Sequence, residues 1–355
     1  MYSRTITEAP EELIKNGKPI FGTFGTMPAR LDIRGVEQPF SFPPLPAFLT
    51  NFQIRSNMSF MFNTRRIIGS IDFFSINLFG FAEVVLWDTE TNRKYAYRTV
   101  VGPRRKFIPY NLWSGRCSTH RSGRLIKISW NRKEKRLSLT ARLDGDSLRP
   151  TATLVLKAQL DSPLFSEAAA VIPAPVTRRC RAIYRLTAPI SGTVSLMPKT
   201  GDQLSIPAND GSALFDMHRA YYKLRTKSEY AYGFGKIGER HIAFSLADST
   251  IEAMRPNEYN ENFLFCGGKL TALPPVKITC PLGINGDWII QDTKSMVDLV
   301  FTPRSVYSRM HSLVVLTTRY HSIYGAFNGV LLTKTGEKIV LKDFLGVTKK
   351  HLIRL

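Results

Sequence analysis

The sequence has few cysteines, and its most apolar stretch is interrupted by acids. Four cysteines in 355 residues, none in a CxxC pair, indicate neither a disulfide framework nor a zinc module. Residues 67–87 are the most apolar part of the chain, but they include Asp72 and Glu83, which argues against a membrane span. Residues 1–20 contain no apolar core, so we expect no secretory signal.

Several catalytic motifs are also missing. Neither the nucleophile pattern GxSxG nor the phosphate-binding pattern GxxxxGKS/T occurs. The six histidines form no HxH or HExxH pair of the kind that binds a metal. These absences lower the probability of most hydrolase and kinase classes, and we expect neither a metal nor another cofactor.

Acidic residues are scarce relative to basic ones. The chain has 28 Asp and Glu against 49 Lys and Arg, which gives a net charge of +21 and a pI of about 10. Such an excess indicates an anionic partner: nucleic acid, an anionic membrane face or an acidic ligand. The composition is otherwise that of a globular chain. We expect a cytoplasmic protein, with peripheral attachment to the inner face of the membrane as a further expectation.

What the sequence does contain is a succession of strand patterns. Apolar and polar residues alternate on both sides of a polar turn in 124–142, 287–301 and 326–342, which predicts three hairpins. In the last of these, Gly336 suits a turn that requires positive φ. Residues 181–197 show the same alternation, and we expect the SGT triplet there to be a turn between two strands.

Helical patterns are rare. Residues 9–17 predict a short helix, with proline early and glycine after its end. Residues 213–225 are compatible with either a helix or an irregular strand. Many short strands without repeated helical crossovers favour an all-β fold of the sandwich or barrel type.

The alternation is interrupted by proline and charge near residues 161–180, which is the best candidate for a domain boundary. The resulting division is an N-terminal extension with a short helix (1–20), a first β domain (21–175) and a second, barrel-like β domain (176–355).

One glycine motif is discounted. Residues 233–238 match GxGxxG, but a dinucleotide-binding loop must open a helix. The residues that follow, ERHIAFSLADS, predict a strand, so we interpret the glycines as part of a turn.

A polar cluster precedes the apolar segment that begins at residue 263. Glu261 lies between Asn260 and Asn262 and could act as a general acid or base; the alternative is a solvated loop. On a strand, the period of two would send the two asparagines to one face and Glu261 to the other. We predict that the asparagines face inward and bind the ligand, because an uncompensated buried carboxylate is costly.

A second polar cluster lies in residues 213–225. Asp216 and Tyr221 are candidate catalytic residues, and Arg219 and Tyr222 are candidate ligand-binding residues. His218 lies close to Asp216, and a histidine beside an acid permits proton transfer near neutral pH.

The positive charge is concentrated in residues 93–136, which hold fourteen Lys and Arg, interleaved aromatics and a single acid. This mixture is typical of single-stranded nucleic-acid binding and equally of contact with anionic lipid. It also fits a solvated basic rim above a core. Because no nucleic-acid motif occurs, lipid is the more probable partner. The candidate contact residues are Arg104, Arg105, Lys106, Arg132 and Lys133.

Five segments carry a resemblance to a known family: 68–88, 216–226, 260–278 (NENFLFCGGKLTALPPVKI), 287–303 and 324–347. Together they resemble the bacterial domain of unknown function 2804 family. More loosely, the chain is similar to tandem lipocalin-like proteins that include carotenoid hydratases. The resemblance implies two lipocalin-like β-barrels or sandwiches in tandem, with an apolar ligand held in or between them.

Three functions remain open. The first is binding of a lipophilic or lipid-like small molecule without catalysis. The second is a hydratase or isomerase, with Glu261 or Asp216 as acid or base and Tyr221 or Tyr222 as donor. The third is nucleic-acid binding through residues 93–136. An apolar cavity on which Glu261 and Asp216 converge would favour the second, and a positive groove with exposed Trp113 and Trp130 would favour the third.

Overall fold

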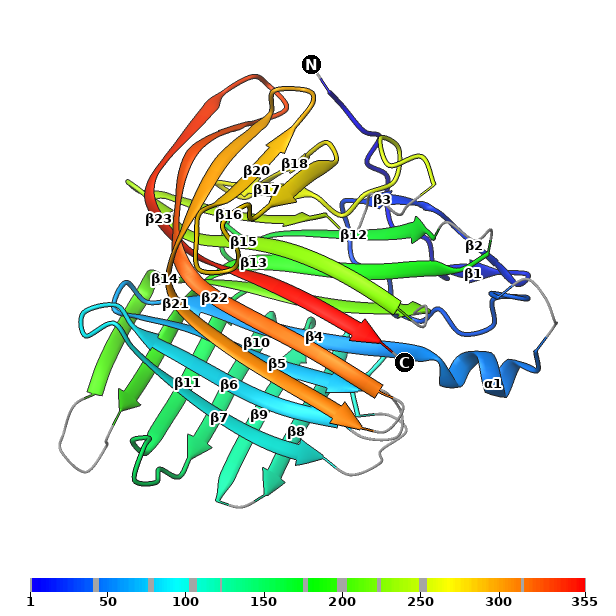
Figure 1. Ribbon diagram of the computed structural model, residues 1–355. Helices are drawn as coiled ribbons and strands as arrows, with labels where there is room; N and C mark the ends of the chain where they lie inside the picture. Colours follow the sequence, from blue (N-terminus) through cyan, green and yellow to red (C-terminus); the bar gives the residue numbers. More distant parts are fainter. Residues whose placement is uncertain are drawn as a thin grey trace.

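The computed structural model shows a nearly all-β protein with two curled sheets in tandem (Figure 1), which confirms the predicted fold class. One short helix, α1 (Ala47–Phe52), is present in the described part of the chain. The structure describes all residues except 1, 41–44, 76–79, 102–106, 122, 175–177, 197–202, 222–224, 249–253, 314–315 and 355.

The first sheet has twelve strands and is antiparallel throughout its hydrogen-bonded pairs. Its path runs β7 (Arg93–Val101), β6 (Gly80–Asp88), β5 (Ile67–Ser75), β4 (Ile54–Asn63), β14 (Gln203–Tyr221), β13 (Cys180–Leu196), β11 (Ala152–Gln159), β10 (Arg136–Leu143), β9 (Arg124–Asn131) and β8 (Ser114–Arg121). Off this path, β12 (Ser166–Pro173) pairs with β13 and with β3 (Gly22–Phe24). The two ends of this path, β7 and β8, approach each other. This is seen where Arg121 on β8 donates to the carbonyl oxygen of Val100 on β7.

The second sheet has nine strands. Its path runs β18 (Lys269–Ala272), β17 (Phe263–Cys266), β16 (Arg240–Ala247), β15 (Arg225–Ile237), β23 (Lys338–Arg354), β22 (Leu316–Leu332), β21 (Val297–Leu313), β20 (Trp288–Asp292) and β19 (Val276–Thr279). The chain passes from the first sheet to the second between Tyr221 and Arg225. The expected division at residues 175 and 176 lies inside the first sheet, between β12 and β13.

The three predicted hairpins are confirmed: β9–β10, β20–β21 and β22–β23. Gly336 lies in the last turn with φ 82°, as the turn requires. The helix expected at residues 9–17 is wrong. That segment contains the small hairpin of β1 (Ile14–Lys15) and β2 (Lys18–Pro19), because Asn16 and Gly17 both adopt positive φ and form a tight two-residue turn.

The turn expected at the SGT triplet is also wrong. β13 continues through it to Leu196, and the irregularity there is a bulge between Ile190 and Gly192. Residues 213–221 belong to strand β14. Gly233 and Gly235 lie within β15 and Gly238 lies in the turn to β16, so no helix follows the motif.

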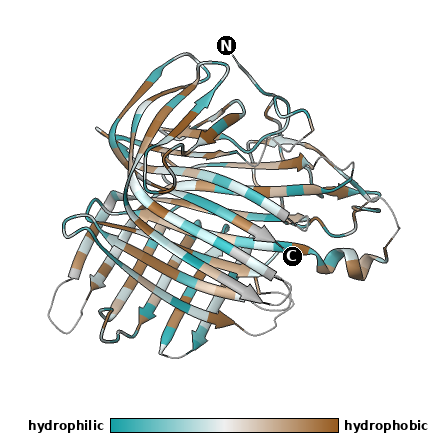
Figure 2. Cartoon of the chain, in the orientation of Figure 1, coloured by the Kyte–Doolittle hydropathy of each residue, from teal (hydrophilic) through white to brown (hydrophobic). Residues whose placement is uncertain are grey.

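Strand β14 serves two packing layers. Phe215, Met217 and Tyr221 face the core enclosed by the first sheet, whereas Leu214 belongs to a cluster between the two sheets. This follows from the period of two along a strand. Figure 2 shows the corresponding alternation of hydrophobic and hydrophilic residues along the long strands. The second sheet encloses a core of its own.

In the described part of the chain, no helix is long and apolar enough to cross a membrane.

Candidate functional site

A cavity lies between the two sheets. The even-numbered side chains of β14, such as Asp216 and His218, point toward it. The cavity itself has a volume of about 60 Å³ and opens to solvent. The first sheet contributes residues from β4, β5, β6 and β14, and the second from β15, β21, β22 and β23. The lining residues are Asn57, Ser59, Asp72, Phe73, Phe74, Phe81, Asp216, His218, Tyr230, Tyr232, Arg309, Arg319, Tyr320, Lys349 and His351.

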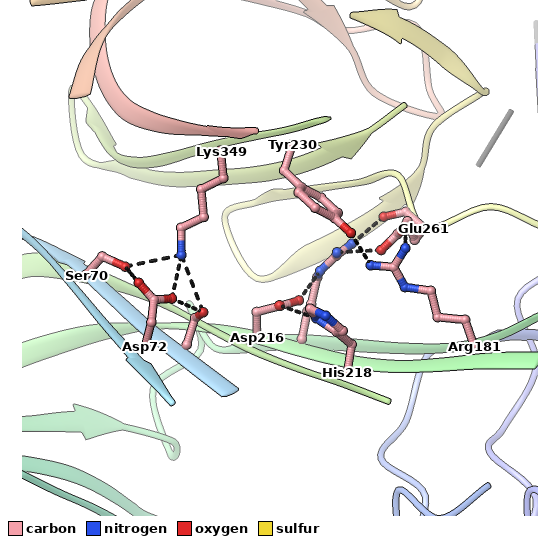
Figure 3. Close-up of polar contacts among 10 residues, drawn as sticks. Ser70, Asp72, Arg181, Asp216, His218, Tyr230, Glu261 and Lys349 are labelled. Carbon is pink, nitrogen blue, oxygen red and sulfur yellow. Dashed lines mark hydrogen bonds and ion pairs between the residues drawn. The ribbon is translucent and has the colours of Figure 1, made fainter. Parts of the chain in front are cut away.

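Arg185 on β13 holds the two acids that the sequence singled out. Its Nε donates to Oδ1 of Asp216 at 2.6 Å, and its Nη2 donates to Oε2 of Glu261 at 2.8 Å (Figure 3 shows this cluster). Arg181, four residues earlier on the same face of β13, pairs with Oε1 of Glu261 at 2.9 Å. Asp216 and Glu261 therefore converge on one buried guanidinium, although of the two only Asp216 lines the cavity.

The charges of this cluster balance. Burial alone would raise the pKa of Asp216, but Arg185 and His218 outweigh it and hold that pKa well below its ordinary value. For Glu261, burial again acts to raise the pKa, and Arg181 and Arg185 reverse the direction to a net lowering. Two carboxylates thus face two guanidinium groups, and the cluster is neutral when His218 is uncharged.

His218 connects this cluster to the cavity. Its Nδ1 lies 3.2 Å from Oδ2 of Asp216. Burial is the main cause that lowers the pKa of His218, and Arg181 adds to it, so the imidazole is neutral near pH 7. A neutral ring that donates Nδ1–H to the Asp216 carboxylate leaves Nε2 as a proton acceptor. The arrangement provides a general base oriented by a carboxylate.

A second charged pair lies in the same cavity. Nζ of Lys349 on β23 donates to Oδ1 of Asp72 on β5 at 2.6 Å and to Oγ of Ser70 at 3.2 Å. Ser70 also donates to Oδ2 of Asp72 at 2.6 Å, and Ser59 donates to Oδ1. Burial acts to raise the pKa of Asp72, but Lys349 and the two serines bring it below its ordinary value. The pair joins the two sheets and places an ammonium group beside the cavity.

Phenols complete the polar lining. The hydroxyl oxygen of Tyr230 accepts a hydrogen bond from Nη2 of Arg181 at 2.5 Å, which leaves its own proton available to another acceptor. The Tyr320 hydroxyl donates to Oδ2 of Asp72 at 3.4 Å. Burial raises the pKa of Tyr232 and of Tyr320 well above the ordinary value, so both phenols stay protonated.

The structure separates the candidates that lie close together in residues 213–225. Tyr221 and Arg219 lie on the opposite face of β14 from Asp216, inside the first sheet. The Tyr221 hydroxyl donates to the carbonyl oxygen of Ile33. The guanidinium of Arg219 stacks 3.8 Å from the ring centroid of Tyr110 and donates to Ser56 and to two backbone carbonyls. Burial lowers the pKa of Arg219 to about 10. Tyr222 lies outside the described residues.

The polar cluster before residue 263 is packed differently from the expected strand geometry. β17 begins only at Phe263, and Asn260, Glu261 and Asn262 are all fully buried, so the alternation of faces does not apply. The Asn262 side chain bonds the backbone of Ala247 and Pro274, and Asn260 donates to the Pro256 carbonyl. The expectation that Glu261 faces away from the interior is wrong: Glu261 is buried, and Arg181 and Arg185 compensate its charge. Neither asparagine lines the cavity.

The described residues of the basic segment 93–136 do not all face solvent. Arg104, Arg105 and Lys106 lie outside them. Arg132 is paired with Glu167 at 3.0 Å and stacks on Phe165, whereas Lys133 is exposed. Trp113 is exposed, but Trp130 is buried and its indole N–H donates to the Asn111 carbonyl.

Several cavity residues have no counterpart in the sequence analysis. Lys349, His351, Tyr230 and Tyr320 come from the long strands of the second sheet and meet Asp72 only through tertiary folding. The one available signal is that charged residues interrupt otherwise apolar strands. Among the described residues, no group of three or more His, Cys, Asp or Glu side chains could hold a metal ion.

Fold and cavity define an all-β protein with two sheets in tandem and a polar cavity between them. The chain belongs to the family described as Domain of unknown function (DUF2804), which it matches over residues 11–355. No curated protein matches the sequence.

Two solved structures are similar to this chain. Kievitone hydratase from Nectria haematococca has a TM-score of 0.49 and 11% sequence identity, over 84% of this chain and 88% of that chain. A protein from Nitrosomonas europaea assigned as an ATTH has a TM-score of 0.37 and 10% identity, over 88% of this chain and 98% of that chain.

Proposed function

We propose that the protein is a hydratase or isomerase that moves protons on a lipophilic small molecule held between the two sheets. The observation that carries this proposal is the chain of contacts Glu261–Arg185–Asp216–His218, which ends at the cavity. A buried ionised carboxylate that orients a neutral imidazole is typical of general base catalysis.

The residues around the cavity could supply both proton transfers that a water addition needs. His218 Nε2 accepts a proton from water as the water oxygen bonds one carbon of a substrate double bond. An acid elsewhere in the cavity gives a proton to the other carbon, and Lys349 and Tyr230 are the candidates for this donor. The proton on His218 then returns through solvent to the donor, so the sum is one water added to one double bond, and the reverse sequence eliminates water. An isomerisation needs only the two proton transfers.

The apolar part of the lining fits a lipophilic substrate. Phe74 and Phe81, whose rings stack on each other, form one wall, and the stacked rings of Tyr230 and Tyr232 lie 5.9 Å apart, centroid to centroid, in another. Aromatic walls with a few converging polar groups are typical of small-molecule sites. The same walls support a second candidate function, which is binding of such a molecule without catalysis.

Deuterium incorporation tests the proposal. Protein purified from its own host is first examined by native mass spectrometry for a retained lipophilic molecule. That molecule, or a panel of conjugated enones if none is retained, is then incubated with the enzyme in D₂O and followed by mass spectrometry. We expect deuterium incorporation or a mass change of one water with the wild type, and a loss of at least 100-fold in His218→Gln.

The matched control is His120→Gln, because His120 is exposed and does not line the cavity. It should keep the wild-type rate. Equal rates in wild type and His218→Gln would refute the role of His218. A retained molecule that undergoes neither exchange nor hydration would favour binding alone.

A further inference from the structure

The helix α1 carries large apolar side chains on its outer side. Phe48 is 73% exposed, and Leu45, Leu49 and Phe52 are exposed as well, whereas Thr50 is buried. Figure 1 shows α1 projecting from the side of the molecule, and Figure 2 shows hydrophobic residues on it. Scattered single apolar residues are normal on a surface, but several on one projecting element mark an interaction site.

Further exposed apolar side chains lie next to residues that line the cavity. Val100 is 50% exposed and is the cross-strand partner of Phe81, which lines the cavity. Met310 is 60% exposed and is the cross-strand partner of Arg319, which also lines it. Both sheets therefore contribute an exposed apolar residue beside the entrance.

The cavity mouth and α1 are close in the chain as well as in space. Asn57, which lines the cavity, follows the end of α1 by five residues on strand β4, or at most about 17 Å of extended chain. Asn57 is the cross-strand partner of Phe74, another lining residue. The Asn51 side chain of α1 also meets the Tyr221 hydroxyl at the end of β14, where the first sheet ends.

Two exposed arginines lie at this end. Residues 38–71, which include α1 and β4, contain no Asp or Glu. Arg121 is exposed and donates to the Val100 carbonyl, and Arg319 is exposed at the mouth. Exposed apolar residues with arginines beside them match the boundary between the acyl chains and the anionic headgroups of a bilayer.

We propose that α1 and the rim formed by Val100, Met310, Arg121 and Arg319 dock on an anionic lipid bilayer, with the cavity mouth facing the lipid. The apolar side chains enter the acyl boundary while the arginines meet headgroup phosphates. A lipophilic ligand then reaches the cavity without crossing water. This inference goes beyond the proposed catalysis and does not depend on it, because vesicle binding requires no turnover.

Vesicle sedimentation tests the proposal directly. Full-length protein is mixed with vesicles of phosphatidylcholine containing 30% phosphatidylserine at low salt. We expect binding that weakens as salt is raised and is much weaker on pure phosphatidylcholine. F48S/L49S should lower the partition coefficient at least tenfold. The matched control is V300S/V340S, which removes two side chains that are 37% and 50% exposed. Val300 lies ten positions from Met310 on β21, and Val340 pairs with Val330, eleven positions from Arg319 on β22.

Arg121→Gln and Arg319→Gln together should reduce both the affinity and its salt dependence. A loss equal to that of F48S/L49S in V300S/V340S, or no loss in F48S/L49S, would overturn the proposal. Equal binding to neutral vesicles would overturn its electrostatic part. Self-association that F48S/L49S abolishes in the absence of lipid would identify a second copy of the chain as the occupant instead.

Depth measurement provides a second readout that does not depend on loss of binding. In Phe48→Trp, we expect the new fluorescence to be quenched by vesicles that contain brominated phosphatidylcholine. Val340→Trp, at the far end of the second sheet, should show no such quenching. Quenching of both or of neither would contradict the proposed orientation on the bilayer.

Discussion

The replacement of Arg185 by methionine tests the architecture of the buried ion cluster most directly. The guanidinium is fully buried and holds Asp216 at 2.6 Å and Glu261 at 2.8 Å. Methionine fills much of the volume but leaves two carboxylates in the layer between the sheets, with only Arg181 facing one of them. Breaking a buried ion pair by removing one partner costs about 3–5 kcal/mol. We expect the free energy of unfolding at pH 7.5 to fall by that amount.

The pH dependence of this loss tests whether Arg185 stabilises the fold by neutralising buried carboxylates. In the wild type, the folded-state pKa of Asp216 is depressed, so its contribution to stability is present above about pH 4 and is lost as the pH falls through the folded-state pKa. In Arg185→Met, burial without the arginine raises the folded-state pKa of Asp216 above its unfolded value. The variant therefore regains stability on acidification, and the difference from wild type shrinks between pH 7.5 and pH 5.

Urea unfolding at both pH values, followed by tryptophan fluorescence, measures the two differences. Arg255→Met is the matched control, because it removes an arginine from the exposed pair with Glu258, and exposed pairs contribute little. A loss below about 1 kcal/mol in Arg185→Met, or a loss that stays the same at both pH values, would refute the idea that Arg185 neutralises buried carboxylates.

Three further outcomes follow from the structure. Lys349→Met leaves the Asp72 carboxylate without its cation and should lower the free energy of unfolding by about 3 kcal/mol; adding Asp72→Asn should recover part of it in a denaturant titration. Gly192→Ala, at φ 140°, would place Cβ 2.0 Å from a carbonyl oxygen of β11, whereas Cβ at Gly283, at φ 80°, meets nothing within 4 Å. Gly283→Ala should cost about 1–2 kcal/mol and Gly192→Ala clearly more, and thermal melts that rank them the other way would contradict the close approach. Burial, with Lys349 adding, holds the pKa of His351 well below its ordinary value, so its contribution to stability is lost as the pH falls below about 6.5. In His351→Gln, the slope of the free energy of unfolding against pH, between pH 7 and 5, should be smaller by up to about 1.4 kcal/mol per pH unit. An unchanged slope would show that His351 is not the source of this pH dependence.

The alternation of apolar and polar residues predicted most strands, because each of these strands has one face against a core. It also contained information that the sequence analysis left unused on β14. Applied to residues 216–221, it places Asp216 and His218 on one face and Arg219 and Tyr221 on the other, which is the separation the structure shows. Proximity in sequence is a poor guide to a shared site on a strand.

The partners of the buried acids could not be predicted in this way. Lys349 and Asp72 are 277 positions apart in sequence, and Arg185 and Glu261 are 76 apart. Which strand of one sheet lies against which strand of the other depends on twist and packing across the whole interface, and no local pattern encodes it. The expectation for Glu261 was wrong for the same reason, since the compensating arginines come from β13.

The cavity is built from strand interiors, and this constrains how the protein can change over evolution. Every described lining residue lies on a hydrogen-bonded strand, and on β14 the neighbouring positions in the chain fill the first core. Lengthening a loop would leave the ligand's surroundings untouched, and inserting one residue in a strand would exchange its two faces. New ligand preferences within this family should therefore arise by exchange of single side chains at alternate positions, while the connecting segments drift freely in length.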